Sequence, residues 1–146
     1  KIKNNINICV VRIFSYRYYN QKNFFFIPSV YSKFKKQKFP SFKNVNHERD
    51  FVDIRDIANA IKLLFLLKKR GIYNIGTRDT LSKKEFAVKI FKRLKKNINF
   101  KSISCDIQKT PRGKNLGLNV KKIEKKIGYK MPTSGNTVTN LIKEYQ

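Results

Sequence analysis

The chain has 146 residues, of which 40% are hydrophobic and 12 are phenylalanine, so its composition suits the core of one domain. No apolar run approaches the roughly 20 residues of a membrane-spanning helix, and Lys1–Asn7 lacks the apolar centre of a signal peptide. Cys9 and Cys105 stand alone, which excludes a pattern of zinc ligands and predicts two free thiols in a reducing cytoplasm. Because Met131 is the only methionine, we expect a processed product or a fragment of a longer protein.

The net charge of +25 at pH 7 invites an interpretation as a nucleic-acid-binding protein, but the composition offers another cause. Lys, Asn, Ile, Phe and Tyr, whose codons can be written with A and T alone, make up 77 of the 146 residues. Lysine also outnumbers arginine 26 to 8, although arginine is the better fork of donors for phosphates and bases. An AT-rich genome accounts for the charge, and we expect only nonspecific affinity for nucleic acid.

The first third of the chain predicts one strand, one helix and loops. The run 6–14 is rich in β-branched residues and apolar on both faces, which favours a strand buried within a parallel sheet. Residues 15–26 lack periodicity and predict a loop. Pro28 suits the first turn of a polar, exposed helix that runs to residue 36. Residues 39–46 predict a loop or an edge strand.

The middle of the chain alternates between strand and helix patterns. Residues 51–54 predict a short strand. Apolar residues then recur at helical spacing from Ile57 to Phe65, and Arg70-Gly71 predicts the end of that helix. Residues 72–75 return to a strand pattern, closed by Gly76.

The last part of the chain predicts three helices and one strand. Ser82 and Glu85 form a capping-box pattern ahead of a helix whose apolar residues share one face. Residues 97–104 predict a strand, and residues 120–127 predict a short basic helix ended by Gly128. A last amphipathic helix is expected from Val138 to Tyr145. Strands that alternate with helices indicate an α/β fold with at least partly parallel pairing.

Four of the nine acidic residues lie between Glu48 and Asp56, which is unusual in so basic a chain. Asp53 or Asp56 would cap the helix that follows, and we expect this role mainly of Asp56. Arg49 has two interpretations. It forms an ion pair with Asp50 or Asp53, or its guanidinium grips a diphosphate through two aligned donors.

Several segments resemble one family. Arg49–Ala58 (RDFVDIRDIA) resembles the RDFV-x-V-x-D-V-A signature of the extended short-chain dehydrogenase/reductases, the NAD-dependent nucleotide-sugar epimerase/dehydratase family. Gly71–Gly76 (GIYNIG) is similar to its G-x-Y-N-I-G strand, and Leu81–Phe86 to the capped helix that follows. Val10–Phe14 resembles its buried V-x-x-R-x-F-N strand, and residues 118–130 resemble its L-D-x-S-K … L-G-W-x-P ending. The order and spacing of these matches extend over essentially the whole chain.

The resemblance implies the C-terminal part of a Rossmann-like enzyme that transfers hydride through NAD or NADP while modifying the sugar of a nucleotide-sugar. Residues 1–20 and 49–76 would supply the last parallel strands and a helix of the dinucleotide-binding fold. Residues 21–48 and 77–146 would form a small substrate-binding region. The implied partners are a nucleotide diphosphate sugar and an N-terminal cofactor-binding half, and the resemblance also allows a homodimer of the parent enzyme.

The resemblance also implies binding residues. Arg49 matches the position where the family commonly places an arginine on the diphosphate, and Arg112 matches a second such arginine more loosely. Phe39, Pro40 and Phe42 match the stretch beside the nucleotide base, where an aromatic face suits stacking. Ordinary packing stays open for the two phenylalanines, as does a plain surface position for Arg112.

The chain also departs from the family. Ser15 replaces a substrate-contacting asparagine, and the Gly-Pro turn that should follow is absent from residues 16–19. No glycine-rich phosphate loop occurs among the six glycines, and the catalytic Tyr-x-x-x-Lys helix would precede the 6–14 strand. Tyr18 with Lys22, and Tyr31 with Lys35, spell this pattern by coincidence. We therefore expect no catalytic residue, no bound NAD or NADP and no activity in this chain alone.

The sequence thus predicts the substrate-binding portion of a nucleotide-sugar epimerase, dehydratase or reductase. A basic nucleic-acid-binding protein and a noncatalytic relic of the family stay open as alternatives. Without the cofactor-binding half, the flank of the 6–14 strand would be exposed and prone to aggregation.

Overall fold

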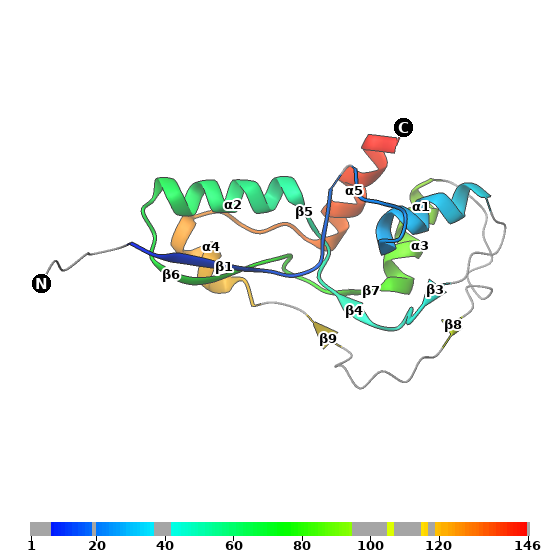
Figure 1. The fold of residues 1–146 in the computed structure, drawn as a ribbon, viewed down its shortest axis with the longest axis horizontal. Coiled ribbons are helices and arrows are strands. Elements are labelled where there is room, and N and C mark those ends of the chain that lie inside the picture. The colour runs from blue at the N-terminus through cyan, green and yellow to red at the C-terminus, as the bar shows by residue number, and fades with distance from the viewer. Residues whose placement is uncertain are drawn as a thin grey trace, which may run out of the picture.

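Two parallel strands form the centre of one end of the molecule in the computed structural model, which describes residues 7–18, 20–36, 42–94, 105–106, 115–116 and 119–145. Strand β1 (Cys9–Ile13) pairs with β6 (Gly71–Ile75) over five residues, so the predicted parallel pairing is confirmed (Figure 1). The prediction that β1 is buried on both faces is wrong. Val10 and its partner Ile72 are each 45% exposed, because the helices cover only the opposite face of this pair.

A first core lies between these two strands and the helices α2 (Ile54–Leu66) and α4 (Lys121–Ile127). Ile57, Ala60 and Leu64 of α2 are buried, as their helical spacing predicts. They pack in one cluster with Tyr73 of β6 and Ile123 of α4. The predicted end of α4 is confirmed, since Gly128 adopts a left-handed conformation with a φ of 65°.

Helix α2 ends four residues earlier than the glycine pattern predicted. Its last residue is Leu66, and Lys68 takes the left-handed conformation after it, with a φ of 48°. The Lys68 amide donates to the Phe65 carbonyl at 3.0 Å, which helps to close the turn without a glycine. Gly71 instead begins β6, and its amide donates to the Ile8 carbonyl at 3.0 Å.

A second core joins three helices at the other end of the molecule (Figure 1). These are α1 (Phe26–Lys36), α3 (Lys83–Arg93) and α5 (Ser134–Tyr145). The capping box of α3 and the buried faces of α3 and α5 are confirmed. The prediction of an exposed α1 is wrong, because Ile27 and Val30 share one face and are 4% and 0% exposed.

Short strands connect the two cores. β2 (Tyr16–Arg17) pairs in parallel with β5 (Val52–Asp53), so the loop predicted for 15–26 contains a strand, while the strand predicted at 51–54 is confirmed. β4 (Glu48–Arg49) pairs antiparallel with β7 (Leu81–Ser82) and in parallel with β9 (Asn115–Leu116). β3 (Phe42–Lys43) pairs in parallel with β8 (Cys105–Asp106). The strand predicted at 97–104 lies outside the described residues. None of the helices in the described ranges is long and apolar enough to cross a membrane.

Asp53 is the residue that caps α2, not Asp56 as the sequence favoured. The Asp53 side chain accepts a hydrogen bond from the Arg55 amide at 3.0 Å. Asp56 lies in the first turn of the helix, where its carboxylate accepts from the Tyr129 hydroxyl at 3.1 Å. Both carboxylates thus serve the structure around the start of α2.

Candidate functional site

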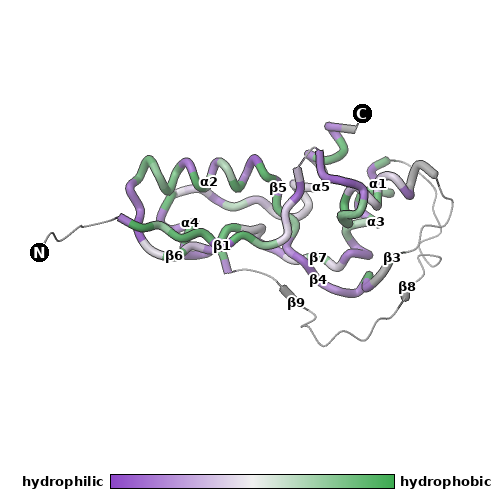
Figure 2. Tube along the Cα trace, in the orientation of Figure 1, coloured by the Kyte–Doolittle hydropathy of each residue, from purple (hydrophilic) through white to green (hydrophobic). Residues whose placement is uncertain are grey.

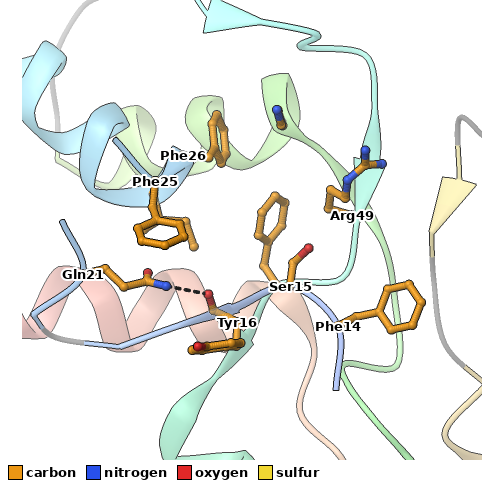
Figure 3. A pocket seen from close by; sticks show the side chains of 10 residues that line it. Phe14, Ser15, Tyr16, Gln21, Phe25, Phe26 and Arg49 are labelled. Atoms are coloured by element: carbon orange, nitrogen blue, oxygen red, sulfur yellow. Dashed lines mark hydrogen bonds between the residues drawn. The ribbon is translucent and has the colours of Figure 1, made fainter. Parts of the chain in front are cut away.

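A pocket of about 320 Å³ lies where the segment after β1, the start of α1, strand β4 and the start of α3 meet. Figure 3 shows Phe25 and Phe26, at the start of α1, on one side of the pocket and Arg49 of β4 on another, with Ser15 and Tyr16 below them. The pocket is lined by Phe14, Ser15, Tyr16, Gln21, Phe25, Phe26, Ile27, Arg49, Phe51 and Lys83. Its lining combines aromatic rings, two cationic side chains and a hydroxyl, which is a mixture suited to a partly apolar anion.

The aromatic wall of the pocket continues directly into the second core. The rings of Phe26 and Phe51 are stacked, with centroids 5.6 Å apart. Both contact Phe86, which is 0% exposed, at centroid distances of 6.2 and 4.4 Å. Rings packed against one another in this way form a rigid surface, so this wall of the pocket is fixed by core packing.

Ser15, which stands where the family has a substrate-contacting asparagine and is therefore a candidate substrate contact, lines the same pocket as Arg49. Its carbonyl accepts a hydrogen bond from the Val52 amide at 3.1 Å, which ties the segment after β1 to the strand that follows Arg49. The side-chain amide of Gln21 donates to the Tyr16 carbonyl at 3.0 Å and holds the same segment at the next residue (Figure 3). The backbone therefore holds Ser15 at the pocket.

Arg49 is half-buried, and its hydrogen bonds are with its own strand. One terminal nitrogen donates to the Glu48 carbonyl at 2.7 Å, and the other lies 3.4 Å from Nδ1 of His47. Neither partner atom belongs to a carboxylate, so these two contacts do not neutralise the positive charge of the guanidinium.

The ion pair expected between Arg49 and Asp50 or Asp53 is not formed among the described residues, and the neighbouring carboxylates bind other groups. Glu48 accepts from the Thr80 hydroxyl at 2.9 Å, and Asp50 accepts from the Thr77 amide at 2.8 Å. Asp53 forms ion pairs with Arg17 and Arg55. The acidic cluster therefore organises the backbone around the site without neutralising Arg49.

Lys83, which the sequence reasoning missed, is the second cation of the pocket. It is the first residue of α3 after the N-cap Ser82, and its ammonium lies over the ring of Phe26, 5.4 Å from the ring centroid. Burial and the positive charge of Arg49 lower the pKa of Lys83. The capping box was visible in the sequence, but nothing local indicated that the residue after the cap faces Arg49.

The other predicted binding residues are placed differently. Phe42 is 6% exposed and packs edge-on against Phe26, at a centroid distance of 5.9 Å, behind the pocket wall. The structure accounts for it as a core residue, and its contact with a nucleotide base stays a prediction. Phe39, Pro40 and Arg112 lie outside the described residues.

The described residues do not fit the dinucleotide cofactor that the resemblance implies. The segment after β1 passes through Phe14 and Ser15 and has no glycine to let a pyrophosphate approach the backbone. Gly76 follows the other parallel strand, but its open side is filled, since an added Cβ would lie 2.2 Å from Oδ2 of Asp50.

Comparison with solved structures finds this fold within larger proteins. The chain is 17% identical to RMD from Pseudomonas aeruginosa, complexed with NADPH, with a TM-score of 0.80 over 99% of this chain and 50% of that one. It is 18% identical to dTDP-glucose 4,6-dehydratase from Bacillus anthracis, in complex with NAD, with a TM-score of 0.79 over 94% of this chain and 44% of that one. For WbmG from Bordetella bronchiseptica, in complex with NAD and UDP, the identity is 18% and the TM-score 0.72, over 97% and 44%. The chain thus spans about half the length of these proteins.

The sequence itself gives the family. No curated protein sequence matches the chain. The sequence profile of the NAD dependent epimerase/dehydratase family, however, matches residues 3–76, which run from the start of the chain through β6. This match covers half of the chain and agrees with the Rossmann-like parallel strands of the structure. The chain therefore belongs to the NAD dependent epimerase/dehydratase family.

Proposed function

We propose that this chain is the substrate-binding portion of a nucleotide-sugar epimerase, dehydratase or reductase, and that it is inactive alone. The observation that carries the proposal is Arg49, a half-buried guanidinium in a pocket with aromatic walls that forms no ion pair among the described residues. A guanidinium in this state attracts an anion, and its planar fork matches the oxygens of a diphosphate. That WbmG is in complex with UDP supports a nucleotide diphosphate as the ligand.

The pocket would bind this ligand by dividing it between its charged and apolar parts. Arg49 would hold the diphosphate, and the Ser15 hydroxyl would donate to an oxygen of the phosphate or the sugar. The Phe25 and Phe26 rings would exclude water from one side of the ligand and strengthen the charged contacts. Hydride transfer would belong to a cofactor-binding portion, because the described residues of this pocket offer no glycine-rich site for a dinucleotide.

We propose that the cofactor-binding portion packs at the free edge of β1, the edge that does not pair with β6. Within the described residues β1 pairs only with β6, so its other edge offers free backbone donors and acceptors. Figure 2 shows hydrophobic residues along β1 and on α2. Beside β1, Phe65 and Leu66 of α2 are 80% and 59% exposed. A free strand edge beside exposed apolar side chains suits a neighbouring parallel strand and its helix.

Calorimetry with UDP, GDP and dTDP tests the proposed function, with Arg49→Ala as the variant. We expect one nucleotide to bind to the chain and this binding to be lost in the variant, which would also identify the base. Lys62→Ala, which removes the charge of an exposed lysine on α2 outside the pocket, is the matched control and should bind as the unchanged chain does.

A negative result is also informative. If no nucleotide binds and random DNA binds tightly in a salt-sensitive manner, the proposed substrate-binding function is wrong. The positive net charge of the chain would then serve to bind nucleic acid. The location of the protein in the cytoplasm stays a prediction from its cysteines.

A further inference from the structure

We propose that Lys83 is a second binding residue for the diphosphate of the ligand, acting together with Arg49. This inference rests on the proposed function, since it concerns the same pocket. Both side chains line the pocket, and they come from different elements, β4 and α3. Neither takes part in any ion pair among the described residues.

The backbone fixes the position of Lys83 relative to Arg49. Strand β7 pairs antiparallel with β4, and Leu81 is the register partner of Arg49. Lys83 follows this pair by two residues, and its amide donates to the His47 carbonyl at 3.2 Å. Because the strand pairing and this hydrogen bond both anchor the start of α3 to β4, the two cations are held near each other before any ligand binds.

Lys83 is unfavourable where it lies, and this points to a function. It is the first residue of α3, and the N-terminus of a helix carries a partial positive charge that disfavours a cation. The charge of Arg49 adds a second repulsion, and partial burial removes water from the ammonium. The ring of Phe26 offers some compensation, with its centroid 5.4 Å from the nitrogen. An anion between Lys83 and Arg49 would relieve both repulsions at once.

The side chains, rather than the helix amides, must bind that anion. The Lys83 amide is bonded to the His47 carbonyl, and the Lys84 amide donates to the Val45 carbonyl at 2.9 Å. The Glu85 amide donates to the Ser82 hydroxyl at 3.1 Å. These amides of the first turn are already used, so the positive charges available to a ligand are the ammonium and the guanidinium.

Two separate cations favour a ligand with two linked negative groups. A diphosphate presents one phosphate to each cation, whereas a monophosphate engages the second cation poorly. The pair therefore selects nucleoside diphosphates over the corresponding monophosphates, and an uncharged nucleoside gains nothing from it.

The test compares Lys83→Met with the matched variant Lys84→Met. Methionine keeps the apolar stem that packs near Phe26 and removes only the charge, and Lys84 is an exposed lysine one residue away. Calorimetry would use UDP, GDP and dTDP with their monophosphates at one salt concentration. We expect Lys83→Met to weaken diphosphate binding about tenfold or more, as loss of one charged hydrogen bond implies. Lys84→Met should change it less than twofold, and Lys83→Arg should retain most of it.

A measurement on the unchanged chain avoids any dependence on the folding of the variants. Lysine acetylation by a limiting amount of acetic anhydride would be followed by mass spectrometry, with and without the diphosphate. We expect the nucleotide to protect Lys83, while Lys84 serves as the internal control.

The outcomes separate the two proposals. If the chain binds a diphosphate through Arg49, but Lys83→Met behaves as Lys84→Met does and Lys83 is not protected, the role of Lys83 is wrong and the proposed function stands. If the unchanged chain binds no nucleotide, both proposals fail.

Discussion

The guanidinium of Arg17 donates to the carboxylate of Asp53 inside the protein, where the two side chains are 2% and 1% exposed. Arg17 also pairs with Glu144 of α5, and Asp53 also accepts from Arg55 while it caps α2. The ion pairs around Arg17 and Asp53 thus link β2, β5, α2 and α5, which contribute to both cores.

Asp53→Asn should be strongly destabilising. The variant leaves Arg17 buried with one charged partner fewer, and breaking a buried ion pair costs about 3–5 kcal/mol. Urea unfolding followed by circular dichroism would measure the loss. Asp56→Asn is the control, because its amide oxygen can still accept from Tyr129. Equal, small losses in the two variants would contradict a structural role for the Arg17–Asp53 pair.

The same pair predicts how stability depends on acid. Burial alone would raise the pKa of Asp53, but hydrogen bonds from Arg55 and the charge of Arg17 outweigh it and hold the pKa below its ordinary value of 3.8. A carboxyl whose pKa is lower in the folded state stabilises the fold above the unfolded pKa. This contribution is lost as the pH falls through the folded pKa. The difference in unfolding free energy between the unchanged chain and Asp53→Asn should therefore shrink below about pH 3.8. A difference that is constant from pH 6 to pH 2 would argue against this ionisation.

Gly76→Ala and Gly135→Ala should have effects of opposite sign. At Gly76 the new Cβ would lie 2.2 Å from Oδ2 and 2.8 Å from Cγ of Asp50, a buried side chain that also binds Thr77. Relieving this overlap should cost about 1–3 kcal/mol. At Gly135, in α5, the nearest atom is 3.5 Å away, so alanine should stabilise by about 0.4–1 kcal/mol. Thermal unfolding would give the melting temperatures of both variants. Similar values would mean that the Asp50 side chain moves aside at little cost in stability.

Ser82→Ala removes the N-cap of α3 and one side of its capping box. The Ser82 hydroxyl accepts from the Glu85 amide, and the Glu85 carboxylate accepts from the Ser82 amide at 2.8 Å. These bonds also lower the pKa of Glu85. We expect a loss of about 1 kcal/mol in unfolding free energy, which Ser82→Asp should largely restore because aspartate also caps helices. An unchanged stability in Ser82→Ala would mean that packing alone fixes the start of α3.

Phe65→Glu should reduce self-association of the isolated chain. Phe65 is 80% exposed on α2, so its replacement removes apolar surface near β1 without opening a cavity. Sedimentation velocity would show fewer large species, with little change in melting temperature. Tyr129→Phe is the control, because Tyr129 lies away from this apolar surface and its hydroxyl donates to Asp56. This variant should associate as the unchanged chain does. If Phe65→Glu associates as much as the unchanged chain, the exposed apolar surface of α2 is not the cause of the association.

The secondary structure was largely predictable from local sequence. The capping box at Ser82, the glycine after α4 and the apolar spacing of α2, α3 and α5 all act within one or two turns of a helix, so the pattern and its effect lie in the same few residues. The two errors at the ends of α2 arose where another residue took the expected role. Lys68 ended α2 in place of a glycine, and Asp53 capped it in place of Asp56.

The family and its signature arginine also came from the sequence, because short motifs in a fixed order are a local property of the chain. The tertiary structure decided which charges remain available. Arg49 and Lys83 are 34 positions apart in sequence, yet both line one pocket, while the acids beside Arg49 turn to Thr80, Thr77 and Arg17. Whether a charged side chain is neutralised depends on partners brought together by strand pairing and helix packing, and no local pattern of residues contains that information.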